Sequence, residues 1–221
     1  MNPELIRPIL TVDVVLFALY EGQVHVVLQE REKPPHRGQL ALVGGYVHPE
    51  EDQSTSAAAA RVLRSKTGLT ARVLEQLMTF SGVDRDPRGW SASVAYCALL
   101  PSDDLASRCD NSLKNLPLHK AKGLPFDHDA IVAKAAERCR RRAGYSSLPA
   151  FLLPPTFTLP ALRQAYEAVL GRTLNDSAFR RKIDELRMIE PVAGATSRAS
   201  DRPARLYRLS RDQVVEFDRT L

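Results

Sequence analysis

The sequence has few cysteines and no long apolar run, and each shortage excludes a class of protein. Its three cysteines, Cys97, Cys109 and Cys139, are widely and irregularly spaced. This spacing argues against a disulfide framework and against a zinc site, so we expect free thiols. No apolar stretch approaches the roughly 20 residues of a membrane-spanning helix, and the first residues show no export signal. We therefore expect a soluble, cytoplasmic protein.

Positive charge is concentrated in one part of the chain. The 221 residues carry a formal net charge of +5. Residues 156–211 hold 11 Lys plus Arg against 6 Asp plus Glu, a surplus of 5 that equals the surplus of the whole chain. A localised basic surface is typical of proteins that bind polyanions.

The first two thirds of the chain mix strand and helix patterns. Residues 11–20 and 24–29 predict a β-hairpin, and an apolar segment at 40–43 runs into Gly44 and Gly45. Ser54 is the expected N-cap of a helix that ends at Gly68. Two more strands are predicted at 71–79 and 91–100, and a helix over 127–143 with Asp127 as its N-cap. The fold class is therefore mixed α/β.

A stretch rich in proline and serine, residues 146–155, predicts a domain boundary. We expect a first domain over residues 1–148 and a second over 149–221. Downstream, Thr158 predicts the N-cap of one helix and Asp176 the N-cap of a second, which runs to Arg187. Apolar segments separated by a polar loop follow, which is the order of elements in a winged helix-turn-helix domain.

One motif combines a glycine turn with the helix after it. Gly45 and Glu51 fit the start of the pattern G-x5-E-x7-R-E-U-x-E-E-x-G-U, and Arg61 and Gly68 fit its end if two extra residues are allowed between the halves. This pattern is the Nudix box, and the stretches DRDPRGWSASVAY and GLPFDHDAIV also resemble Nudix proteins that act on ADP-ribose. The resemblance implies a Nudix-type α/β/α sandwich.

The resemblance fails at the residues that hold metal. Active Nudix proteins use helix glutamates to bind Mg²⁺ against a diphosphate, because a hard cation needs clustered carboxylates. Val62, Ser65 and Lys66 occupy the three matching positions. We therefore expect neither a metal site nor catalysis. The acidic residues 50–52 fit a residual cation site or an exposed acidic loop, and we favour the loop.

A set of glycine, arginine and aromatic residues near this motif is the candidate ligand site. The guanidinium fork of arginine matches phosphate geometry, and tryptophan can stack on a base or ribose. The alternative is a solvated hairpin loop. The candidates are Arg31, Gly44, Gly45, Arg61, Asp84, Arg85, Arg88 and Trp90.

Residues 157–210, together with the altered Nudix box, resemble Nudix-related transcriptional regulators of NAD metabolism. The resemblance implies a homodimeric repressor of NAD biosynthesis or of ADP-ribose or sugar metabolism genes. Its palindromic double-stranded DNA operator would be released by ADP-ribose or a related nucleotide, and no cofactor would be required.

The candidate DNA-binding residues are mostly basic and lie on the second helix and the wing. They are Thr158, Arg172, Ser177, Arg180, Arg181, Lys182, Arg198, Arg202 and Arg205. The alternative interpretation of the basic run at 180–182 is a solvated helix face without a binding role. Two other functions remain open: an active Nudix hydrolase, an ADP-ribose pyrophosphatase with an accessory domain, and a module that binds only proteins.

Overall fold

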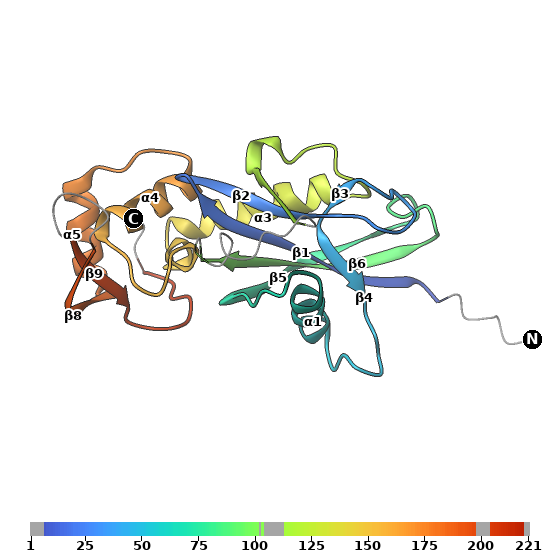
Figure 1. Cartoon of the computed structure of the whole chain (residues 1–221), viewed down its shortest axis with the longest axis horizontal. Helices are drawn as coiled ribbons and strands as arrows, with labels where there is room; N and C mark the ends of the chain where they lie inside the picture. The colour runs from blue at the N-terminus through green and yellow to red at the C-terminus, as the bar shows by residue number, and fades with distance from the viewer. Residues whose placement is uncertain (1–6, 102, 104–112, 198–203, 219–221) are drawn as a thin grey trace, which may run out of the picture.

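The computed structural model describes residues 7–101, 103, 113–197 and 204–218. A seven-stranded sheet lies between helices, and a smaller part made of two helices and a two-stranded sheet lies at one end of the molecule (Figure 1). Of the described helices, none is long and apolar enough to cross a membrane. The arrangement is the mixed α/β sandwich with an added helical domain that the sequence predicted.

The large sheet contains the predicted hairpin at its centre. Its strands are β1 (Ile9–Tyr20), β2 (Gln23–Glu30), β3 (Leu40–Ala41), β4 (Val43–Tyr46), β5 (Val73–Gly82), β6 (Ser91–Leu100) and β7 (Leu113–Pro117). The strand order is β3-β2-β1-β6-β5, while β4 pairs with β1 and β7 pairs with β2. Strands β1 and β2 are antiparallel, whereas β1 and β6 are parallel.

The helices and the small sheet complete the structure. They are α1 (Thr55–Thr67), η1 (Leu118–Lys120), α3 (His128–Ala143), η2 (Leu148–Leu152), α4 (Leu159–Leu170), α5 (Asp176–Leu186), β8 (Ile189–Ser197) and β9 (Ala204–Leu209). Strand β7 was not predicted, because its sequence LKNLP has no clear alternation and ends in proline. It forms through non-local pairing with β2.

The alternation of β1 divides the core into two layers. Val14 and Leu16 belong to the apolar cluster that includes residues of α1. Val15 and Phe17 belong to the cluster that includes residues of α3. Because side chains alternate along a strand, one uninterrupted apolar run supplies both faces of the sheet.

Three helix starts test the predicted caps. The Ser54 hydroxyl accepts a hydrogen bond from the amide of Ala57, which confirms the first cap. Asp127 is the N-cap residue of α3, as predicted, although its side chain makes no capping hydrogen bond. The prediction for α5 was wrong by one residue, because Asn175 is the N-cap and Asp176 is the first helical residue.

The predicted boundary at residues 146–155 is not an exposed linker. All five residues of η2 are buried there, and Phe151 belongs to the same apolar cluster as Phe17 of β1 and Tyr166 of α4. The Tyr166 hydroxyl also donates a 2.8 Å hydrogen bond to the carbonyl of Ser146. The sheet and the C-terminal helices therefore share one core, and the division at residue 148 stays a prediction.

Two of the three cysteines lie in this core. Cys97 and Cys139 are buried free thiols, as predicted, with their sulfur atoms 3.5 Å apart. The contact with Cys139 and then burial raise the pKa of the Cys97 thiol. Cys109 lies outside the described residues.

Candidate ligand site and nucleic-acid interface

A buried carboxylate, Asp13, lies at the centre of the candidate ligand site. It accepts a 2.6 Å hydrogen bond from the Ser93 hydroxyl and a 3.4 Å one from Arg85, and its other oxygen lies 3.5 Å from Nε2 of His128. Burial raises the pKa of Asp13, but the contacts with His128, Ser93 and Arg85 outweigh it and hold the pKa at about 2. The carboxylate is therefore ionised at neutral pH.

His128 connects this carboxylate to the first residue of α3. Its Nδ1 accepts a 3.1 Å hydrogen bond from the amide of Leu42, so the proton of the neutral ring lies on Nε2, which faces Asp13. The beginning of α3 is thereby fixed to β1 and to the strand segment around Leu42.

Gly44 and Gly45 allow close packing around Asp13. Gly44 lies opposite Asp13 in the β1–β4 pairing, and a Cβ added to it would lie 2.0 Å from a carboxylate oxygen. A Cβ added to Gly45 would lie 2.9 Å from Cγ2 of Val62. Both predicted site residues are glycine because the carboxylate and α1 approach the backbone of β4.

The two arginines of the β5–β6 loop already have partners. Arg85 is nearly buried and donates two hydrogen bonds, of 3.0 and 2.8 Å, to the Asp127 carboxylate. Arg88 is more exposed and donates bonds of 2.9 and 2.6 Å to Asp86, and it also contacts the hydroxyl of Tyr46. Arg85 holds the site together, while Arg88 lies at its rim.

Arg61 is also engaged. Its guanidinium donates bonds of 2.7 and 2.6 Å to the carboxylate of Asp52 and one of 3.0 Å to the carbonyl of Tyr46. The bonds from Arg61 hold the pKa of Asp52 at about 2. This ion pair connects the acidic loop at residues 50–52 to α1. The Asp52 carboxylate is therefore already paired with an arginine.

The remaining ligand candidates surround the same region. Nε of Arg31 donates a 2.8 Å bond to the carbonyl of Pro35, and its guanidinium lies 4.8 Å from the ring centre of Phe126. Trp90 is 47% exposed, and Asp84 is exposed on the same loop. Arg31 and Trp90 thus keep surfaces with which a ligand can interact.

The residues that replace the Nudix glutamates do not fit a magnesium ion. Val62 is 2% exposed and packs on Gly45, and the Ser65 hydroxyl donates to the carbonyl of Val62 within its own helix. Lys66 supplies a cation. Within the described ranges, no group of three or more His, Cys, Asp or Glu side chains is placed to hold a metal ion.

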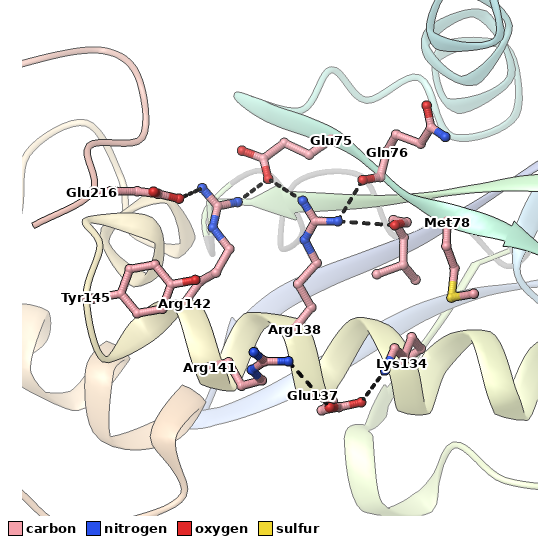
Figure 2. A pocket seen from close by; sticks show the side chains of 11 residues that line it. Glu75, Gln76, Met78, Lys134, Glu137, Arg138, Arg141, Arg142, Tyr145 and Glu216 are labelled. Carbon is pink, nitrogen blue, oxygen red and sulfur yellow. Dashed lines mark hydrogen bonds and ion pairs between the residues drawn. The ribbon is translucent and has the colours of Figure 1, made fainter. Parts of the chain in front are cut away.

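A hollow of about 640 Å³ lies elsewhere, between α3 and β5. Figure 2 shows that its charged side chains face one another in ion pairs. Arg142 contacts Glu75 and lies 3.3 Å from Glu216, and Arg138 donates to the carbonyls of Gln76 and Leu77. These contacts join α3 to the sheet edge and to the C-terminal segment, so we do not assign the ligand to this hollow.

Helix α5 presents an apolar side to the core and charged side chains of both signs to solvent. Phe179 and Ile183 are buried, and the Phe179 ring lies 5.6 Å from that of Tyr166. The predicted DNA-binding residues of this helix lie on its other faces. Ser177, Arg180 and Arg181 are exposed, and Lys182 is half-buried.

The other DNA-binding candidates divide into three groups. Thr158 uses its hydroxyl to cap α4, accepting from the amide of Ala161. Arg172 and Arg205 are exposed, Arg172 in the turn between α4 and α5 and Arg205 on β9. Arg198 and Arg202 lie outside the described residues.

Sequence reasoning did not identify several residues of the site. Asp13, Asp86, Asp127 and His128 carry its buried polar contacts, yet none was selected as a ligand-site candidate. The available signal was an acid inside the apolar run TVDVVLF, because a buried charge normally requires a partner.

Comparisons with known proteins agree with this arrangement. Residues 10–138 match the family model described as the NUDIX domain, and residues 149–209 match the NrtR DNA-binding winged helix domain. A relative from Acinetobacter baylyi, described as an ADPR responsive transcriptional repressor, is 36% identical over 219 residues, covering 97% of this chain and 87% of that protein.

Two solved structures are similar. The Shewanella oneidensis NrtR complexed with a 27mer DNA has a TM-score of 0.86 and 34% identity, covering 96% of this chain and 99% of that one. The NUDIX domain of the same protein complexed with ADP ribose has a TM-score of 0.55 and 31% identity, covering 62% and 93%. The chain thus belongs to the NUDIX domain family, among the members that also carry an NrtR DNA-binding winged helix domain.

Proposed function

We propose that this protein is a transcriptional repressor that binds an operator through α5 and releases it when ADP-ribose binds near Asp13. The observation that carries the proposal is that one continuous apolar core joins a Nudix domain, in which Val62, Ser65 and Lys66 occupy the glutamate positions, to a helix that exposes Arg180 and Arg181. The relatives that match nearly the whole chain are described as an ADPR responsive transcriptional repressor and as NrtR complexed with a 27mer DNA.

Helix α3 is the element through which the two sites communicate. It begins at His128 beside Asp13 and ends near Arg142, which contacts Glu216 of the C-terminal segment. Its 16 residues span about 24 Å. A ligand that displaces the beginning of α3 shifts a rigid rod packed against the winged helix, and such differential contacts couple the two binding equilibria.

DNA binding uses the exposed arginines of α5 and of the wing. The beginning of a recognition helix meets base edges and phosphates, which suits Ser177 and Arg181. We propose a homodimer on a palindromic operator, because two-fold protein symmetry matches two half-sites. The effector is ADP-ribose or a related nucleotide, and no cofactor is required.

The test is a gel-shift titration of DNA fragments that the full-length protein itself retains from its genome. ADP-ribose at increasing concentration should release the DNA. A ligand that binds more tightly to the DNA-free conformation of the protein shifts the population toward that conformation. An operator affinity that does not change at saturating ADP-ribose would contradict the repressor proposal.

The proposal also holds that the chain does not hydrolyse ADP-ribose. It is supported by Val62, Ser65 and Lys66 in place of the metal-binding glutamates. AMP release should be measured with Mg²⁺ and with Mn²⁺ over a long incubation. Metal-dependent turnover would instead favour an ADP-ribose pyrophosphatase with an accessory domain.

A further inference from the structure

One of the residues that replace the Nudix glutamates, Lys66, is a cation whose charge acts on a second cation, Arg31. Lys66 lies in the last turn of α1, one turn after Val62, whose methyl group packs on Gly45. Residues four apart lie on the same helix face, so Lys66 continues the face that covers Gly45. Asp13 lies behind Gly44, and its charge acts on Lys66.

Lys66 and Arg31 have no acidic partner among the residues that the structure describes. In the described part of the chain, the Arg31 side chain donates hydrogen bonds only to the carbonyls of Pro35 and Lys33, and the Lys66 ammonium forms neither a hydrogen bond nor an ion pair. Arg61, by contrast, is joined to a carboxylate by short bonds.

The two cations act on each other. Removal from bulk water and the nearby Arg31 lower the pKa of Lys66. Removal from bulk water and the charge of Arg88 lower the pKa of Arg31 in the same way. In both cases the loss of hydration is the larger cause and the neighbouring cation the second, while the charge of Asp13 acts in the opposite direction. Two neighbouring cations without a paired acid among the described residues provide a place where an anion can bind.

We propose that Lys66, together with Arg31, binds the diphosphate of the effector at the place where Mg²⁺ bridges glutamates and diphosphate in active Nudix proteins. This inference rests on the proposed function and names the chemistry of that site. An ammonium and a guanidinium replace a divalent cation in charge, since each forms charge-assisted hydrogen bonds to phosphate oxygens. Effector binding is therefore independent of metal, and it favours diphosphates over monophosphates.

The test is isothermal titration of the full-length protein with ADP-ribose and with AMP, in EDTA and in Mg²⁺. The wild type should bind ADP-ribose equally well in both buffers. Lys66→Met should weaken ADP-ribose binding by roughly tenfold to a hundredfold, the range for a lost charge-assisted bond, and AMP binding by a smaller factor. Lys66→Glu should weaken ADP-ribose binding further, and Lys66→Arg should retain most of it.

Arg64→Met is the matched control, because Arg64 is an exposed cation in the same helix turn. It should leave the affinity for ADP-ribose within about twofold of the wild type, as expected for a surface change away from the site. Thermal melting of each variant without ligand checks the fold.

The outcomes separate the two proposals. A wild type that does not bind ADP-ribose in either buffer overturns the proposed function and this inference with it. A wild type that binds only with Mg²⁺, or a Lys66→Met variant that binds as tightly as Arg64→Met, overturns the role of Lys66 and leaves the repressor proposal standing.

Discussion

Asp13 is the buried centre of the polar contacts in the candidate ligand site. A buried carboxylate is stable only when donors replace the water it has lost, and here Ser93 and Arg85 donate to it while His128 faces it. The same carboxylate fills the space above Gly44. The position of Asp13 therefore sets both the polar contacts of the site and the residue type on the neighbouring strand.

Replacing Gly44 by alanine should destabilise the protein. The added Cβ would lie 2.0 Å from the Asp13 carboxylate and 3.0 Å from the backbone oxygen of Val12, so the buried ion pairs must shift. We expect a loss of about 1–3 kcal/mol in the free energy of unfolding, the usual cost of overpacking. Urea denaturation measures it.

Gly144→Ala is the matched control for this variant. Gly144 has right-handed helical dihedrals, and its added Cβ would meet only a backbone oxygen at 3.5 Å. Its free energy of unfolding should stay within about 0.5 kcal/mol of the wild type. Equal stability of the two variants would mean that Asp13 does not constrain Gly44.

Local signals allowed the sequence to predict some of these residues but not the contacts between them. The cap at Ser54 depends on an amide three residues away, so the sequence shows it directly. Asp127 carries the same kind of signal, yet its carboxylate binds Arg85, 42 residues earlier in the chain. That pairing depends on the folded sheet, and no local pattern contains it.

At the scale of elements, the two adjacent arginines of α5 differ in their contacts. Arg180 donates a 2.8 Å bond to Asp176 one turn earlier, whereas Arg181 has no ion pair among the described residues. Surface pairs of this kind contribute little to stability, so both arginines remain available to a phosphate. Of these two arginines, only Arg181 has no acidic partner in the part of the chain that the structure describes.

Arg181→Ala should weaken DNA binding without affecting the fold. Loss of one phosphate contact should reduce the slope of log affinity against log salt by about one and weaken binding across sequences. Fluorescence anisotropy at several salt concentrations measures both effects. Arg141→Ala removes the same charge from an exposed site on α3 and should change neither. Identical salt slopes for the two variants would remove α5 from the DNA interface.

Elements with regular patterns were predicted well, and irregular ones were not. The hairpin of β1 and β2 and the helices α1 and α4 carry apolar periodicity with caps or turns at their ends. The order of elements in the C-terminal part was also predicted. Strand β7 and the burial of η2 depend on partners far away in the chain, which periodicity does not indicate.

Across the whole molecule, the continuous core makes the ligand-binding and DNA-binding parts one structural unit. The cluster that contains Phe17 of β1 also contains Phe151 of η2 and Ile183 of α5. Each fully buried side chain of this size contributes about 1.5–3 kcal/mol, so separating the parts would expose a large apolar surface.

Scanning calorimetry should therefore show one unfolding transition for the full-length protein. ADP-ribose should raise the temperature of that whole transition, because a ligand that binds only the folded state stabilises everything that unfolds with its site. Two resolved transitions, of which ADP-ribose moves only one, would show that the two parts unfold separately.

The buried η2 segment also limits how such proteins can be recombined. Leu148 and Leu152 of η2 lie beside Phe17, Leu99 and α3. A chimera that joins this ligand-binding domain to the DNA-binding domain of another protein would replace these side chains with ones that do not fit the same core. A functional exchange must carry η2 and its contacts with it. In an engineered biosensor of this architecture, the fusion point should therefore not be placed within the proline-rich stretch, because that stretch is part of the core.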